Sequence, residues 1–435
     1  MSAGPDASEP IRLAVLGGSG SGIPVFIAAL RASQQQGRLG AIDVRLFGRD
    51  HAKLEGVRSY IERCPQAAAG SQAPGLSAST HVQLSDALRD ATHIVCLIRP
   101  GGMSGRAQDE AMALAAGVPA DEGIAAGGLA CFLRGRALIS TLAAQCRALA
   151  PSAMFLQMSS PLGLNVAITR NAFGPATYGV CELPLVTLKA VLAHAAPRID
   201  GGCVTARCAG LNHQSWLYAF ADKAGCDRTA HVLHAIDTAE LVDVEPDTIR
   251  EYGAVPLPYL RVYLHVQRVL ASQASSPLRG ATLAAWSNSL DRAYRCVSAE
   301  RDATIRSLLG QRRMDWFNEG LVPVLERLQR DEGSCVPLNV PCAGSLAGVP
   351  ADAIIEIDCS VSRSGAYPLP APAMPARPLE LTQRLAAYER AALQLPPRPS
   401  RRDLADVLSM HPLTPRDGVQ ELAQALSMIR PVALS

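Results

Sequence analysis

The sequence predicts an α/β protein with an N-terminal Rossmann-like parallel sheet domain and a C-terminal mixed α+β catalytic domain. Between residues 11 and 158, short apolar runs alternate with helical stretches, which is the pattern of parallel strands joined by crossover helices. A glycine-rich loop follows the first apolar run. With 435 residues, the chain is also too long for one ordinary core, so two packed lobes are expected.

The composition argues against nucleic acid and membranes as binding partners. The 41 Lys and Arg residues nearly balance the 39 Asp and Glu residues, so no strong field favours nucleic acid or an anionic membrane. No apolar run reaches the length of a membrane span. The 12 cysteines contain no CxxC pair and indicate mostly free thiols in a cytosolic protein. We therefore expect a cytoplasmic protein that binds small molecules, with neither nucleic acid nor a membrane as partner.

Three segments are expected. Residues 1–10 form a polar, disordered tail, residues 11–175 a Rossmann-like dinucleotide-binding domain, and residues 176–435 a metal- and substrate-binding domain. In the second domain, strand-like runs precede Cys181 and His213, and helical stretches occupy 221–245, 258–273 and 300–330. Further strands are expected within 336–358, a proline-rich connector at 368–378, and helices through 379–430.

The first element is an apolar strand, Ile11–Leu16, followed by a glycine loop at 17–22 and a helical stretch from Ile23. This order lets backbone amides approach a pyrophosphate at a helix N-terminus. The alternative is a tight turn without a ligand, because Ile23 stands where a third glycine would complete the usual spacing. We assign to cofactor binding Gly17, Gly18, Ser19, Gly20 and Ser21.

The second strand, Ile42–Phe47, ends at Gly48-Arg49-Asp50. An acidic residue usually accepts the NAD ribose hydroxyl at this point, whereas Arg49 would suit a 2′-phosphate. NADP is therefore an alternative to NAD as the cofactor. The other interpretation is a solvated turn, with Asp50 as the N-cap of a helix that starts near His51.

Strands are also expected at 81–84, 91–98 and 153–158, with a helical segment at 106–134 that is interrupted by glycines at 122–128. Arg99 follows the strand at 91–98. Because ligands bind at the carboxyl ends of strands in doubly wound sheets, Arg99 is assigned to cofactor and substrate.

A thiol, a carboxylate and an imidazole stand in two short segments, Tyr178 to Pro184 and Gly210 to His213. Thiolate and neutral imidazole suit manganese, iron, cobalt or zinc, and Glu182 is a candidate proton donor or acceptor. The alternative for Cys181 is a small buried hydrophobe.

Segments spread over nearly the whole chain resemble, in one order, the NAD- and metal-dependent glycoside hydrolases of family 4, which do not use two-carboxylate chemistry. They include Val180-Cys-Glu-Leu-Pro184 and Gly210-Leu-Asn-His213. The other matching segments are 15–24, 98–102, 127–134, 258–261, 336–341 and 365–369.

The resemblance implies hydrolysis of a 6-phosphorylated glycoside with NAD and a divalent metal such as Mn²⁺. NAD oxidises the sugar C3 hydroxyl, the metal stabilises the enediolate, a base removes the C2 proton, the C1 group is eliminated, and water adds. Cys181 and His213 match the metal ligands, and Tyr259 matches the base. Glu182 matches an acid for the leaving group, and Arg279 an arginine that grips the 6-phosphate.

Each role has an alternative. Tyr259 could be a core aromatic, Arg279 a surface cation, and Glu182 a carboxylate that orients a metal-bound water or a neighbouring helix. Ser160 stands where the family has an asparagine that contacts sugar or metal, and it is assigned with Asn212 to substrate binding.

Other positions also depart from the family pattern: Gly48, Asp121, Ser362 and Ser364. An NAD(P)-dependent sugar or polyol dehydrogenase and a non-catalytic nucleotide-binding relative are the alternative functions. A homodimer or homotetramer is expected by resemblance.

Overall fold

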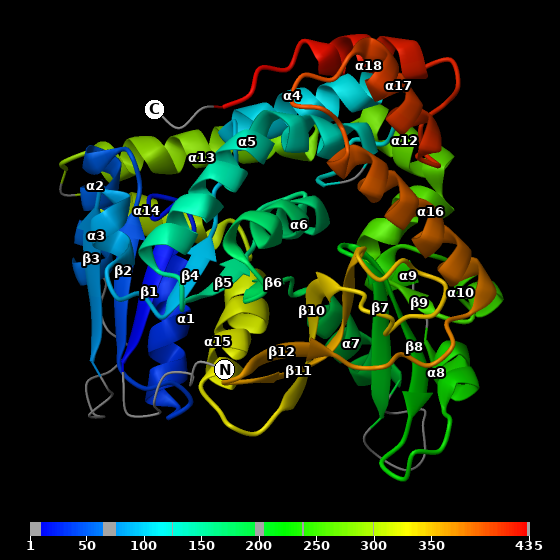
Figure 1. The fold of residues 1–435 in the computed structure, drawn as a ribbon, viewed down its shortest axis with the longest axis horizontal. Helices are drawn as coiled ribbons and strands as arrows, with labels where there is room; N and C mark the ends of the chain where they lie inside the picture. The colour runs from blue at the N-terminus through cyan, green and yellow to red at the C-terminus, as the bar shows by residue number, and fades with distance from the viewer. Residues whose placement is uncertain are drawn as a thin grey trace.

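The N-terminal part of the chain builds a parallel sheet (Figure 1). The computed structural model describes residues 10–63, 75–123, 125–195, 204–236, 239–298 and 300–432. The tail predicted at 1–10 lies outside this part except for Pro10. The strand order is β3-β2-β1-β4-β5-β6, with every adjacent pair parallel, as in dinucleotide-binding folds. These strands are β1 Ile11–Leu16, β2 Ile42–Phe47, β3 Leu76–His81, β4 His93–Cys96, β5 Met154–Gln157 and β6 Thr177–Gly179.

The third strand differs from the prediction. It ends at His81 rather than beginning there, and helix α3 starts at Leu84. Strand β3 pairs only with β2 among the described strands and is partly exposed along its length. Its polar residues, with Ser77, Ser79 and Thr80 among them, therefore gave no apolar signal.

Helices connect these strands, as the alternating pattern predicts. The glycines at 127 and 128 lie inside α5 and do not interrupt it, because the break between α4 and α5 falls before Ala125. A Cβ on Gly128 would lie 2.6 Å from the backbone of Gly123, so this glycine permits close packing. The helices are α1 Ile23–Gln35, α2 His51–Arg63, α3 Leu84–Leu88, α4 Gly102–Ala115, α5 Ala125–Leu149, α6 Leu162–Phe173 and α7 Leu183–Ala195.

The C-terminal part continues the same sheet with antiparallel strands, in the order β6-β10-β11-β7-β8-β9. The two parts join at one residue pair, Asn339 opposite Gly179. The sheet therefore crosses residue 175, where the domain boundary is predicted. The strands are β7 Thr205–Leu211, β8 Gln214–Ala221, β9 Val255–Pro256, β10 Ser334–Pro341, β11 Ile354–Ser362 and β12 Gly365–Pro368, which pairs with β11.

The three long helical stretches predicted here are each broken. Strand β8 runs to Ala221, and a turn follows because Asp222 accepts hydrogen bonds from the amides of Ala224 and Cys226. The remaining stretches divide into short helices. These are α8 Thr229–Ala235, α9 Ala239–Val242, α10 Pro246–Tyr252, η2 Pro258–Leu260, α11 Arg261–Leu264, α12 Val266–Ala274, α14 Arg301–Gly310, the π-helix η3 Trp316–Leu321 and α15 Val322–Leu328.

A further helix, α13 Arg279–Arg295, lies near the top of the view in Figure 1 and packs against α4. The C-terminal helices are α16 Ala376–Leu393, α17 Arg401–Met410 and α18 Val419–Ser427. They confirm the helical prediction for 379–430. The connector predicted at 368–378 is shorter than expected: residues 369–375 form no helix or strand, β12 ends at Pro368, and α16 begins at Ala376.

One hydrophobic core runs through both parts of the sheet, from Val15 on β1 to Ile355 on β11. A second core lies between α5 and the C-terminal helices. Among the described residues, every helix is too short or too polar to cross a bilayer.

Candidate active site

A cavity of about 1200 Å³ opens at the carboxyl ends of the parallel strands, where ligands bind in open α/β sheets. Segments that follow β1, β2, β4, β5 and β6 contribute to its wall, together with the β7–β8 turn, η2, α13 and the region before η3. Gly18 is the one predicted site residue that is not in its wall. The predicted residues that line it are Gly17, Ser19, Gly20, Ser21, Arg49, Arg99, Ser160, Cys181, Glu182, Asn212, His213, Tyr259 and Arg279.

The glycine loop forms one edge of the cavity. The amides of Gly17 and Gly18 both donate to the carbonyl of Phe47, at 3.1 and 2.8 Å. A Cβ on Gly18 would lie 2.6 Å from Leu46, so Gly18 keeps β1 close to β2. At Gly22 a Cβ would lie 2.9 Å from the sulfur of Met314. Gly22 therefore permits the close approach of the segment before η3, which the sequence pattern did not indicate.

The turn after β2 matches the alternative interpretation for Asp50. Its Oδ1 accepts the amide hydrogen of Lys53 at 3.0 Å and caps α2. An ion pair with Arg295 lowers the pKa of Asp50. Asp50 is not among the residues that line the cavity, whereas Arg49 lines it with an exposed side chain.

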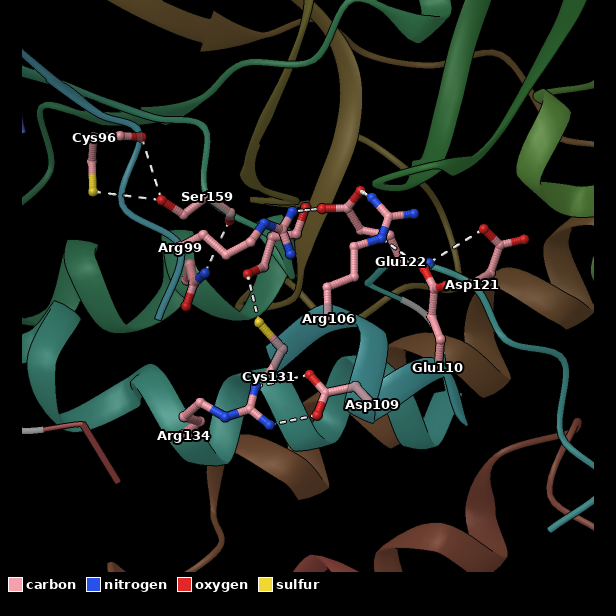
Figure 2. Close-up of polar contacts among 12 residues, drawn as sticks. Cys96, Arg99, Arg106, Asp109, Glu110, Asp121, Glu122, Cys131, Arg134 and Ser159 are labelled. Atoms are coloured by element: carbon pink, nitrogen blue, oxygen red, sulfur yellow. Dashed lines mark hydrogen bonds and ion pairs between the residues drawn. The ribbon is translucent and has the colours of Figure 1, made fainter. Parts of the chain in front are cut away.

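A largely buried ion-pair network lies in the cavity wall, next to the loop that follows β4 (Figure 2). Glu122 pairs with both Arg99 and Arg106. Glu110 also binds Arg106, at 2.7 Å, and its second oxygen accepts the amide of Gly280 at 2.6 Å. The network ties α4, the segment before α5 and the first turn of α13 together.

Arg106 is a cavity residue that the site prediction omits. It is 4% exposed, and its Nη2 has no hydrogen-bond partner in the described part of the chain. A buried N–H group normally finds a partner, so this donor is available to a ligand. The local signal for it is the group of Arg106, Asp109 and Glu110 on α4, which belongs to a segment that resembles family 4.

Two short turns place the predicted metal ligands. Cys181 follows β6 and is buried, and His213 occupies the β7–β8 turn with φ of 66°. Burial lowers the pKa of His213 to about 4, so the ring is neutral at pH 7. It stacks on Tyr259 with ring centroids 4.3 Å apart.

The chemistry of this pair fits a divalent metal, which prefers a neutral imidazole and a polarisable sulfur. Burial and the charges of Glu356 and Glu182 raise the pKa of Cys181 well above its usual range, so a cation would be needed to offset the thiolate charge. No group of three or more His, Cys, Asp and Glu side chains among the described residues could hold a metal. Two protein ligands leave positions for substrate oxygens and water.

Glu356 is a second residue that the site prediction omits. It lies on β11, is 1% exposed, and accepts hydrogen bonds from Asn212, Ser215 and Asn339. Its position in the alternating run of β11 indicates only a strand. A carboxylate between apolar neighbours, Ile355 and Ile357, is the signal that could have identified it.

Three polar side chains that line the cavity have shifted pKa values. Burial raises the pKa of Glu182 to about 7 and that of Asp121 to about 6. Burial, with Asp121 as the next contribution, raises the pKa of Tyr259 to about 12. The charges of Arg106 and Arg279 oppose that rise.

Arg279 and Arg312 face the cavity from α13 and from the segment before η3. The Arg279 side chain is exposed at the rim. The Arg312 guanidinium lies 5.3 Å from the ring of Trp286 and 4.7 Å from that of Trp316. Burial, with the charge of Arg279 as the next contribution, lowers the pKa of Arg312 to about 10.

A parallel sheet in dinucleotide-binding order, with a glycine loop at its carboxyl edge, defines a Rossmann-type α/β protein. Models of two domains match most of the chain: that of the family 4 glycosyl hydrolases over residues 13–196, and that of the C-terminal domain of the same family over residues 208–414. The chain therefore belongs to family 4 of the glycosyl hydrolases, as the resemblance predicts.

Relatives agree with this assignment. The chain is 24% identical to the 6-phospho-beta-glucosidase of Thermotoga maritima over 430 residues, 95% of this chain and 98% of the relative. It is 24% identical to a probable 6-phospho-beta-glucosidase of Bacillus subtilis over 79% of this chain and 80% of the relative. A solved structure of the Thermotoga maritima enzyme with manganese, NAD+ and glucose-6-phosphate has a TM-score of 0.81 at 22% identity, covering 97% of this chain and 100% of that one.

A 6-phospho-alpha-glucosidase from gut microorganisms, solved with NAD and Mn²⁺, has a TM-score of 0.78 at 18% identity. The alignment covers 96% of this chain and 97% of the chain of that enzyme. These likenesses confirm the predicted fold class. Relatives named for both alpha and beta linkages leave the linkage open.

Proposed function

We propose that this protein hydrolyses a 6-phosphorylated glycoside with the help of NAD and a divalent metal such as Mn²⁺. One observation carries the proposal: a single cavity is lined by the glycine loop, by Cys181 and His213, and by Tyr259. Family membership and the names of the relatives support the same activity. A cytoplasmic location and a homodimer or homotetramer belong to the proposal and rest on composition and resemblance.

Residues of this chain are suited to hold both groups. The loop residues Ser19 to Ser21, with Arg99, would hold NAD, and Cys181 with His213 would hold the metal. The chemistry supplied when both are bound is reversible hydride exchange at the sugar C3 and polarisation of the sugar oxygens, which acidifies the C2 proton.

Proton transfers belong to the protein. Tyr259 would take the C2 proton, and the positive charges of Arg106 and Arg279 favour its phenolate. As the bond from C1 to the leaving oxygen breaks, Glu182 would donate its proton to that oxygen. A buried carboxylic acid that keeps its proton near pH 7 is suited to this step. As water adds across the same two carbons, Glu182 would take a proton from the water whose oxygen bonds to C1, and Tyr259 would return its proton to C2. Return of the hydride to C3 would then restore the sugar.

The cavity also favours an anionic substituent on the sugar. Among the described residues, Arg99 and Arg106 pair with two carboxylates, Glu122 and Glu110. Neither Arg279 nor Arg312 forms an ion pair with a carboxylate of the described residues. Two guanidinium groups without counter-charges favour a dianion such as phosphate. This supports a 6-phosphate over a neutral glycoside.

The test is a panel of nitrophenyl glycosides, with and without a 6-phosphate, in Mn²⁺, NAD⁺ and thiol. Cleavage of the phosphorylated compounds, together with exchange of the C2 hydrogen with deuterated solvent, is expected. Activity that survives EDTA would overturn the metal-dependent mechanism. Net accumulation of NADH without cleavage would instead favour a sugar or polyol dehydrogenase.

A further inference from the structure

We propose that Glu356 is a positioning residue of the metal site, whose buried carboxylate holds the segments of Cys181 and His213 in register. The inference rests on the proposed metal-dependent function. Glu356 is not among the residues that line the cavity, so it acts through its neighbours rather than on the substrate.

The hydrogen bonds of Glu356 connect the two segments that carry the ligands. Asn212 and Ser215, on either side of His213 and Gln214, donate to its two oxygens at 3.0 and 2.7 Å. Asn339 donates to the first oxygen at 3.0 Å. Asn339 also stands opposite Gly179, two residues before Cys181. One carboxylate therefore fixes the β7–β8 turn against the end of β6.

The backbone places Glu356 at the centre of this arrangement. In the sheet it stands opposite Asn339 on β10 and opposite Gly210 on β7. Rotation of its side chain is restricted by three donors from three positions. A ligand segment that moves would break at least one of these hydrogen bonds, so the carboxylate resists displacement of either segment.

The partners of Glu356 differ from those of three other buried carboxylates. Asp109, Glu110 and Asp358 each pair with an arginine. Within the described residues, the hydrogen-bond donors to Glu356 are neutral, and it forms no ion pair. Its side-chain contacts are therefore with the β7–β8 turn and with β10, rather than with an arginine.

The experiment compares Glu356→Gln with Asp358→Asn in the full-length protein freed of metal. Asp358 lies two residues further along the same strand, is also buried, and pairs with Arg207 at 3.1 Å. Mn²⁺ affinity is measured from the EPR signal of the free ion, and Co²⁺ binding from the thiolate-to-cobalt absorption band. NAD⁺ affinity and Tm show whether each variant is folded.

Glu356→Gln is expected to weaken Mn²⁺ binding by about 10- to 100-fold and to shift or weaken the cobalt band, with NAD⁺ affinity unchanged. Asp358→Asn should leave both metal signals within about twofold of wild type, because it lies outside this hydrogen-bond group. A folded Glu356→Gln protein with wild-type metal affinity and an unchanged cobalt band would overturn the inference alone. Failure of the wild-type protein to bind either ion would overturn the metal-dependent function as well. If Glu356→Gln does not fold, Asn212→Ala removes one of the three hydrogen bonds to Glu356 and should show a smaller loss of Mn²⁺ affinity.

Discussion

A buried thiol keeps its proton unless a cation offsets the charge of the thiolate, and Cys181 is such a thiol. Burial and two carboxylates raise its pKa well above the usual range. Metal binding at this residue must therefore release a proton. Burial of Cys181 is therefore consistent with both interpretations of this residue, a small hydrophobic side chain and a metal ligand.

Replacement of Cys181 by serine removes the soft ligand. We expect Cys181→Ser to weaken Mn²⁺ and Co²⁺ binding by more than about 100-fold and to abolish the cobalt–thiolate band, with NAD⁺ affinity retained. Cys296→Ser, at an exposed cysteine, is the matched control. Unchanged cobalt absorption in Cys181→Ser would remove this residue from the metal site.

Tyr259→Phe tests the proposed base without loss of the ring that stacks on His213. We expect kcat to fall by about 10²- to 10⁴-fold and exchange of the C2 hydrogen with solvent to disappear. The control is Tyr263→Phe, because the Tyr263 hydroxyl contacts Gln214 and His411 instead. Wild-type exchange in Tyr259→Phe would show that another group takes the proton.

Residue positions were predictable where a local motif carried them. The segments around Cys181, His213 and Tyr259 are short, and the structure brings all three to one cavity. Their roles stay predictions. The role of Glu356 has only a weak local signal, a carboxylate between Ile355 and Ile357, because its surroundings come from segments distant in sequence: it binds Asn212 and Asn339.

Elements were predictable where hydrophobicity repeats clearly. Strands β1, β2, β4 and β5 are apolar and lie close to their predicted ranges. Strand β3 is a polar strand at the end of the sheet, so its burial pattern is weak. The predicted helix at 258–273 is broken at His265, whose backbone leaves the helical region with φ of −135°, a tertiary effect that composition does not record.

The close approach of β1 to β2 at Gly18 can be tested by substitution. We expect Gly18→Ala to lower stability by about 1–3 kcal/mol and to weaken NAD⁺ binding, because the new Cβ would lie 2.6 Å from Leu46 and push β1 from β2. Gly40→Ala is the control, since a Cβ there meets nothing within 4 Å. Calorimetric Tm and NAD⁺ titration of both variants check the expectation. A Gly18→Ala protein as stable as Gly40→Ala would contradict the close approach.

At the scale of the whole molecule, the α/β fold class was predictable from the sequence, but the continuity of the sheet was not. The alternation of strands and helices predicts the parallel part of the sheet. The irregular order of strand-like and helical runs after it predicts the mixed α+β part. Nothing local indicates that β10 would pair with β6, because these strands are separated by most of the second part of the chain. That pairing makes one sheet of two halves and sets the glycine loop and the metal ligands around one cavity.

The joint between the halves can be altered at Gly179. A Cβ there would lie 2.6 Å from both Asn339 and Val166, so Gly179→Ala should move β6 relative to β10. We expect NAD⁺ still to bind, while Mn²⁺ binding weakens and kcat falls by roughly 100-fold, because Cys181 moves relative to His213 and the reacting groups lose their alignment. Gly310→Ala, where a Cβ meets nothing within 4 Å, should keep wild-type kcat. Equal loss of NAD⁺ binding and kcat in Gly179→Ala would indicate unfolding rather than misalignment.

The two aromatic rings around Arg312 also give the protein an optical reporter. Of its three tryptophans, Trp286 and Trp316 line the cavity, whereas Trp216 is fully buried and stacks on Tyr252. Emission from the first two should change when an anion or a nucleotide enters, against a constant signal from the third. Ligand occupancy can therefore be followed by intrinsic fluorescence before any substrate is known, and Trp286→Phe and Trp316→Phe would separate the two sources of the signal.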